Sequence, residues 1–155
     1  MMDFAKMAKD ALHVYPRRVL PVARYSDQER INGLYADLTC SWCDLIEASG
    51  KADDKESVYD AFSSVMLGFF MISNEQKTTY KLLMTKEELD SMKGKWKSAS
   101  FNAVCLIMQQ QLLKSHFEHK IDAFVRAWHI ALKFGLTDLG LDEAVIVKHY
   151  DNLIR

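Results

Sequence analysis

Acidic side chains are concentrated in two short segments on either side of Gly50. The first segment is Asp44-x-x-Glu47, near the end of one predicted helix. The second is Glu56-x-x-x-Asp60, at the start of the next. Each pair spans about one helical turn, so both carboxylates of a pair face the same way. If the two helices pack antiparallel across Gly50, all of these carboxylates meet near one end of the hairpin.

Such a group of like charges needs a cation, and a set of oxygen ligands selects Mg²⁺, Mn²⁺ or Ca²⁺. A metal ion held there would bind phosphate oxygens. It would also lower the pKa of a bound water molecule, which then becomes a nucleophile for phosphoanhydride hydrolysis. The alternative is that these are two solvated helix ends rich in acid. Both interpretations stay open from the sequence.

Three polar residues of the C-terminal segment, which we call the tail motif, could bind an anion. Lys148, Asn152 and Arg155 lie four and three residues apart, so a helix places them on one face. An ammonium group, an amide and a guanidinium group that converge there could hold a phosphate chain. The alternative is a solvated polar face on a terminal helix.

The composition predicts one helical domain that would position these groups. The chain has 155 residues, of which 49% are hydrophobic and 26% charged, with two prolines and six glycines. A chain of this length buries on the order of 70% of its unfolded surface. Apolar residues recur at helical spacing and strand signals are poor, so we expect an all-α bundle of about five to six helices. Residues 1–25 form its N-terminal helix and arm, and 26–155 its helical core.

Local signals predict where the helices begin and end. Ser26 and Glu29 form a capping box that opens a helix to about Ser49. Gly135 is expected to end a later helix, and Thr137 or Asp138 to start the last one. The other expected segments are a helix over 2–14, a loop or extended arm over 16–24, and helices over 54–73, after Thr85, and over 98–120.

The helix over 54–73 combines a polar start with an apolar remainder. Past Val65 it is apolar nearly all round, so we expect it to be central and buried. Before that point Glu56, Asp60 and Ser64 share one face, and Gly68 lies close by. Small residues beside two carboxylates leave room for a ligand, or they let two helices approach closely.

Charge and cysteine usage limit the partners and the compartment. The net charge of −1 gives no reason to expect nucleic acid or an anionic membrane as partner. We see no secretory signal and no apolar run that could cross a bilayer. Three cysteines then favour a reducing compartment, and we expect a cytoplasmic protein. Cys40 and Cys43 have CxxC spacing, but no strand precedes them, so we predict two buried thiols rather than a redox site.

The C-terminal segment resembles that of the all-α nucleoside triphosphate pyrophosphohydrolases, which include dimeric dUTPases, phage dCTP/dUTP pyrophosphatases and MazG-type enzymes. That family closes with K-N-x-x-N-x-x-R-Q. Here Lys148, Asn152 and Arg155 match in register, and His149 replaces the first asparagine. Upstream, the positions that look like the phage members are Ile121, Asp122, Phe124, Gly135 and Thr137.

The family also carries ExxE on one helix and ExxD on the next, which bind Mg²⁺. The chain has a looser version, in which Asp44 replaces a glutamate and the pair from Glu56 to Asp60 is one residue wider. A rival placement puts the second pair at Glu118 and Asp122.

The resemblance implies a Mg²⁺-dependent enzyme that cleaves a pyrimidine dNTP, dUTP or dCTP, to dNMP and pyrophosphate. By this resemblance the phosphates contact Lys148, Asn152 and Arg155, the catalytic carboxylates are Glu47 and Glu56, and the metal ligands are Asp44, Glu47, Glu56 and Asp60. The family also implies a homodimer or a higher homo-oligomer. The alternative is a non-catalytic helical interaction or regulatory protein, of the kind a phage could encode, that keeps the bundle without the metal site.

Overall fold

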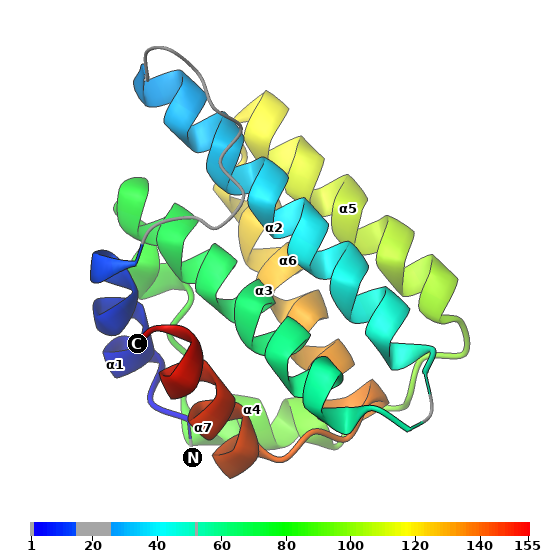
Figure 1. Ribbon diagram of the computed structural model, residues 1–155. Helices are drawn as coiled ribbons and strands as arrows, with labels where there is room; N and C mark the ends of the chain where they lie inside the picture. Colours follow the sequence, from blue (N-terminus) through cyan, green and yellow to red (C-terminus); the bar gives the residue numbers. More distant parts are fainter. Residues whose placement is uncertain (1, 15–25, 52) are drawn as a thin grey trace.

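The computed structural model describes residues 2–14, 26–51 and 53–155, and its regular structure is helical throughout these ranges (Figure 1). The prediction of an all-α bundle is confirmed, with seven α-helices in the described residues against the expected five to six. The predicted arm over 16–24 lies outside the described residues. The α-helices are α1 (Phe4–Asp10), α2 (Asp27–Ser49), α3 (Lys55–Glu75), α4 (Lys86–Lys93), α5 (Phe101–Glu118), α6 (Ile121–Lys133) and α7 (Glu143–Leu153). Shorter helical turns cover Ala11–His13, Thr79–Lys81 and Phe134–Asp138.

Helices α2 and α3 form the predicted antiparallel hairpin (Figure 1). The side chain of Ser26 caps α2 by accepting a hydrogen bond from the Glu29 amide at 3.1 Å. The two helices approach closely where α3 has Gly68, because a Cβ there would lie 2.9 Å from Leu38 Cδ1. This glycine therefore serves helix packing, which is one of the two roles that its sequence context allowed.

Helix α3 lies at the centre of the bundle, as its apolar sequence predicted. It is covered by α2 on one side and by α1 and α7 on the other (Figure 1). Its rings at Phe69 and Phe70 pack at 5.2 and 5.3 Å from Trp128 of α6, and all three side chains are fully buried. The prediction that this helix is buried is confirmed, and its apolar surface is already covered within one chain.

The predicted helix end at Gly135 is wrong, because the chain continues as a π-helical turn over Phe134–Asp138. Glycine is needed there for packing, since a Cβ at Gly135 would lie 2.2 Å from Cε1 of the buried Phe62. Nor does Thr137 or Asp138 start the last helix: the Thr137 hydroxyl donates to a backbone carbonyl, and Asp138 accepts hydrogen bonds from Ser98. Helix α7 begins only at Glu143, after the N-cap Asp142.

Contacts at both ends of α7 fix this helix against the rest of the chain. Near its start, Glu143 pairs with Lys93 and accepts a hydrogen bond from the Met2 amide at 3.2 Å. Near its end, the buried Tyr150 hydroxyl donates to the Met7 carbonyl at 2.7 Å. These bonds fix α7 to the N-terminal segment, to α1 and to α4, and they leave His149 of α7 in contact with Asp60 near the start of α3.

The prediction that the CxxC thiols are buried is wrong. Cys40 and Cys43 are exposed, because Leu38, Trp42 and Leu45 are the α2 residues that face the core. None of the helices within the described residues has the length and apolar content that crossing a membrane requires.

Candidate functional site

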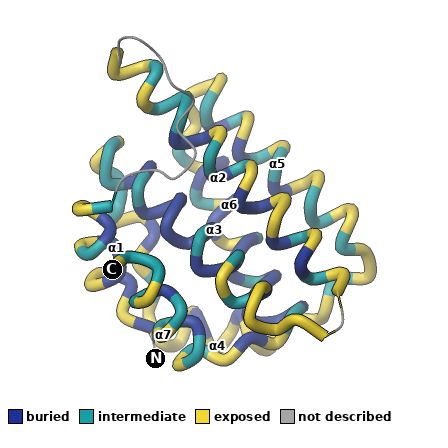
Figure 2. Tube along the Cα trace, in the orientation of Figure 1, coloured by how far each residue is buried: buried dark blue, intermediate teal, exposed yellow. Residues whose placement is uncertain are grey.

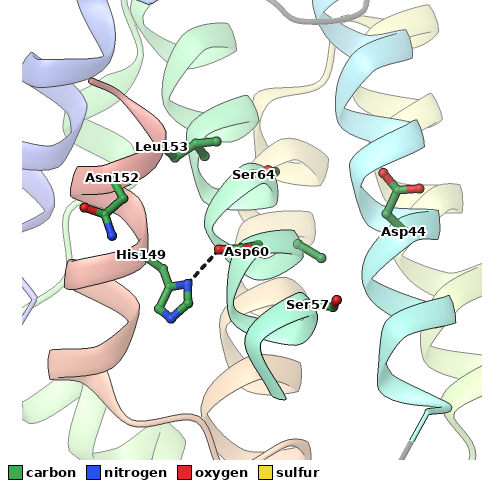
Figure 3. A pocket seen from close by; sticks show the side chains of 8 residues that line it. Asp44, Ser57, Asp60, Ser64, His149, Asn152 and Leu153 are labelled. Atoms are coloured by element: carbon green, nitrogen blue, oxygen red, sulfur yellow. Dashed lines mark hydrogen bonds and ion pairs between the residues drawn. The ribbon is translucent and has the colours of Figure 1, made fainter. Parts of the chain in front are cut away.

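A cavity of about 430 Å³ lies across the first half of α3, between α7 and α2 (Figure 3). This volume is within the range of small-molecule sites. Its lining comes from three helices: Asp44 of α2; Ser57, Asp60, Ala61 and Ser64 of α3; and His149, Asn152 and Leu153 of α7. No lysine or arginine is among these lining residues. An anion bound in the cavity would therefore need a cation as a companion.

Helical spacing explains which side chains face the cavity. On α3 the lining positions 57, 60, 61 and 64 follow the i, i+3, i+4, i+7 pattern of one helical face. The opposite face of the same helix carries Val58, Phe62 and Val65, which are buried in the core. The hydrophobic core thus fixes the rotation of α3, and that rotation turns its small and acidic residues outward.

Two hydrogen bonds hold the first of these small residues at the start of α3. The Ser57 amide and hydroxyl donate to the Asp54 side chain at 3.1 and 2.5 Å. These bonds hold the pKa of Asp54 below its usual value. Asp54 is the N-cap of the helix, so the same contacts define where α3 begins.

His149 is the central side chain of the site. Its Nδ1 lies 2.6 Å from Asp60 Oδ1, and its Nε2 lies 3.3 Å from Glu56 Oε2. Because an ionised carboxylate can only accept, the Nδ1 proton points to Asp60. The side chain of His149 is only 10% exposed, whereas those of Glu56 and Asp60 are 82% and 70% exposed. The imidazole is therefore a fixed donor, and the two carboxylates remain accessible to solvent.

An aromatic neighbour fixes the plane of this imidazole. The Tyr59 ring stacks on His149, with centroids 5.3 Å apart and planes inclined by 21°. The Tyr59 hydroxyl accepts a hydrogen bond from the Asp142 amide at 2.9 Å. Tyr59 of α3 thus contacts the α7 segment at two places: its hydroxyl group at the N-cap Asp142, and its ring at His149.

The structure brings together only part of the predicted residues. Asp44, Asp60 and Asn152 line the same cavity, so the acidic hairpin and the tail meet there. Glu47 and Glu56 are both outside the lining: Glu47 pairs with Lys51 at 3.7 Å, and Glu56 contacts the lining residue His149.

The rest of the predicted phosphate-binding face is arranged differently from the sequence expectation. Lys148 and Arg155 are exposed and are not among the lining residues. Helix α7 ends at Leu153, so Arg155 lies beyond the helix. Its predicted place on one helical face with Lys148 and Asn152 is therefore wrong.

A magnesium site built from protein groups alone is not present in the described part of the chain. There, no three His, Cys, Asp or Glu side chains are grouped so that they could hold a metal ion. Magnesium in nucleotide sites commonly takes one or two carboxylates, with water and substrate phosphates as the other ligands. Asp60, whose carboxylate points to His149, and Asp44, across α3 on α2, each offer one carboxylate to the cavity (Figure 3).

The rival carboxylates lie elsewhere. Glu118 is the last residue of α5 and Asp122 is in the first turn of α6. The turn between these helices is at the opposite end of the molecule from α7 (Figure 1). The rival pair therefore shares no site with the tail motif.

Sequence analysis missed the central role of His149, which it treated only as a departure from a family motif. A usable signal was present, because His149 precedes Asn152 by three residues and so shares its helical face. Ser57 could have been found in the same way, three residues before Asp60. Comparisons of the chain with protein-family models, with curated proteins and with solved structures found no match.

Proposed function

We propose that this chain is a Mg²⁺-dependent nucleoside triphosphate pyrophosphohydrolase, and that the cavity receives the phosphate chain of a pyrimidine dNTP. One observation carries the proposal: Asp44 and Asp60 of the acidic hairpin line a cavity with Asn152 of the tail motif. These residues are far apart in the sequence. Together they offer oxygen ligands for a cation and an amide donor for phosphate.

Each residue has a defined part in this proposal. The Asn152 amide donates to a phosphate oxygen, and Lys148 and Arg155 add positive charge on the same terminal segment. Asp44 and Asp60 would hold Mg²⁺, which when bound neutralises phosphate charge and lowers the pKa of water. Glu47 is given no part, because it pairs with Lys51, whereas Glu56 contacts the lining residue His149.

The proposed reaction uses Glu56, which does not line the cavity itself but contacts the lining residue His149 and is exposed to solvent. Water adds to the α-phosphorus, the bond from that phosphorus to the bridging oxygen breaks, and pyrophosphate leaves with the bonding electrons. The Glu56 carboxylate accepts the proton of the water. The products are a nucleoside monophosphate and pyrophosphate.

A second candidate function is a non-catalytic helical interaction or regulatory protein. The contacts of the acidic residues favour it: His149 contacts both Glu56 and Asp60, and Lys51 contacts Glu47. In this alternative these ion pairs stabilise the packing of α7 on α3 and have no role in catalysis.

The test is pyrophosphate release by the purified full chain from each dNTP in the presence of Mg²⁺. We expect release from dUTP or dCTP, and a loss of about 100-fold in kcat for Asp60→Asn, because one of the two proposed carboxylate ligands of Mg²⁺ is removed. Asp122→Asn, at the far end of the molecule, is the matched control and should keep full activity. No turnover of any dNTP, together with no heat stabilisation by a non-hydrolysable dNTP and Mg²⁺, would exclude the enzyme. Stabilisation without turnover would instead support the non-catalytic alternative.

A further inference from the structure

Two cysteines from different helices come together where α2 runs beside α5 (Figure 1). The side-chain amide of Gln109 donates to Cys43 Sγ of α2 at 3.5 Å and to Cys105 Sγ of α5 at 3.7 Å. Both sulfur atoms are therefore neighbours of one nitrogen atom, although the two cysteines are far apart in the sequence. Cys43 is exposed and Cys105 is half-buried, so a small reagent in solvent reaches this pair.

A buried tryptophan fixes the two helices beside the thiols. The indole Nε1 of Trp42 donates to the backbone carbonyl of Cys105 at 3.3 Å. Trp42 is fully buried, so this bond anchors Cys105 next to the turn of α2 that carries Cys43. Further along the same pair of helices, the hydroxyls of Tyr35 and Ser115 are hydrogen bonded at 2.9 Å. The packing of α2 on α5 thus sets the proximity of the two thiols.

The CxxC spacing alone would suggest a different pair, Cys40 with Cys43. Both belong to the continuous helix α2, in which side chains three residues apart have Cβ atoms about 5–6 Å apart. A disulfide requires about 3.5–4.5 Å between its Cβ atoms. A link from Cys40 to Cys43 would therefore distort α2, whereas a link from Cys43 to Cys105 joins two helices that already pack together.

We propose that Cys43 and Cys105 form a modification site, in which hydrogen peroxide oxidises the two thiols to a disulfide that links α2 to α5. The Cys43 thiolate attacks one oxygen of the peroxide, the O–O bond breaks, and hydroxide leaves, so that Cys43 becomes a sulfenic acid. The Cys105 thiolate then attacks the sulfenic sulfur, the S–S bond forms, and a second hydroxide leaves. The protons of the two thiols convert both hydroxides to water. Two thiols are thus oxidised and one peroxide is reduced, and no part of this inference rests on the proposed function.

The surroundings of Cys43 make this a slow modification site and not a catalytic thiol. Partial burial and the nearby thiols of Cys105 and Cys40 raise the pKa of Cys43. Only the thiolate attacks a peroxide, so little of this cysteine is reactive at neutral pH. The disulfide is therefore expected under sustained exposure to peroxide, and a dithiol reductant reverses it.

Peptide mapping of the full chain after treatment with hydrogen peroxide tests the proposal. The remaining thiols are alkylated before a non-reducing digest and mass spectrometry. We expect a peptide pair that links Cys43 to Cys105 within one chain, an alkylated Cys40, and recovery of all three free thiols after reduction. Cys40→Ser is the matched control and should form the same link, whereas Cys43→Ser and Cys105→Ser should lose it.

Two further measurements on the wild-type chain do not depend on how the variants fold. In concentrated urea the fold no longer selects the partner, so Cys40 and Cys43, which are close in the sequence, should form the main link. The oxidised native chain should unfold about 5–10 °C above the reduced chain, because the link closes a long loop of the unfolded state.

Several results would overturn the proposal. One is a native chain whose main link joins Cys40 to Cys43, and another is a pair that stays free or becomes sulfinic acid without a link. The same pattern of links with and without urea would show that the fold does not select the pair. An oxidised chain that unfolds no higher than the reduced one would show that the link does not fit the native packing of α2 on α5.

Discussion

At the scale of single residues, the imidazole of His149 connects two carboxylates at the cavity. His149 contacts Asp60 and Glu56 at the same time, while both carboxylates remain accessible to solvent. A metal–nucleotide complex that binds Asp60 would have to share this carboxylate with His149. The same histidine therefore holds the Asp60 carboxylate in place and competes with the proposed ligand for it.

A pair of glycine substitutions tests how tightly the core fixes α3 and the turn after α6. Gly135→Ala should lower the free energy of unfolding by about 2–3 kcal/mol, because its Cβ would lie 2.2 Å from the buried Phe62 ring. Gly33→Ala in α2 meets nothing within 4 Å and should raise it by about 1 kcal/mol through helix propensity. Urea unfolding of both variants measures the difference, and equal effects of the two substitutions would contradict this account.

At the scale of elements, local signals predicted the starts of α2 and α4, but not the start of α7, because Thr137 and Asp138 bind distant residues instead of capping a helix. Ser26 and Thr85 cap α2 and α4 as predicted, because an N-cap depends only on residues within one turn. Gly135 failed as a helix end because its role is set by Phe62 of another helix. The identity of the central helix was predictable from its apolar run, which needs no knowledge of its neighbours.

The candidate site was predictable to a similar extent. Asp44 and Asp60 line the same cavity. Their proximity was predictable, because the short link at Gly50 makes α2 and α3 an antiparallel hairpin. The contact of His149 with Asp60 could not be predicted from the sequence. It depends on how α7 packs against α3, and these two helices are far apart in the sequence. Arg155 was misplaced because nothing in the local sequence indicated that α7 ends at Leu153.

The start of α7 gives a pH-dependent prediction. Burial of Glu143 by itself raises its pKa, but hydrogen bonds from Lys93 and the Met2 amide outweigh burial and hold the pKa below the usual 4.5. The folded state thus binds this proton more weakly than the unfolded state. The stabilisation is therefore complete above the unfolded pKa and is lost as the pH falls through the folded pKa.

Glu143→Gln should accordingly lower the free energy of unfolding by about 1–3 kcal/mol at neutral pH, and by less below about pH 4. Urea unfolding of variant and wild type across this pH range measures the difference. Glu118→Gln, at an exposed helix end, is the control and should change little at any pH. A Glu143→Gln effect that is the same at neutral and acidic pH would show that the ionised carboxylate is not what stabilises α7.

At the scale of the whole molecule, burial separates the two halves of α3. Its later residues are covered by the rest of the bundle, whereas its first half borders the cavity between α7 and α2 (Figures 1 and 2). The contacts of α7 with Met2, Met7 and Lys93 keep the α7 side of this cavity in place. Under the proposed function, nucleotide binding therefore depends on the packing of α7 as well as on the residues that line the cavity.

The most direct test of the proposed function is calorimetric titration of the chain with a non-hydrolysable dUTP analogue and Mg²⁺. We predict one site per chain in the wild type and a loss of at least about tenfold in affinity for Ser64→Leu, whose larger side chain fills the cavity without changing its charge. Asp122→Asn should bind like the wild type, since Asp122 lies at the far end of the bundle. Binding that Ser64→Leu leaves unchanged, or a wild-type chain that binds no nucleotide with Mg²⁺, would contradict the assignment of this cavity as the nucleotide site.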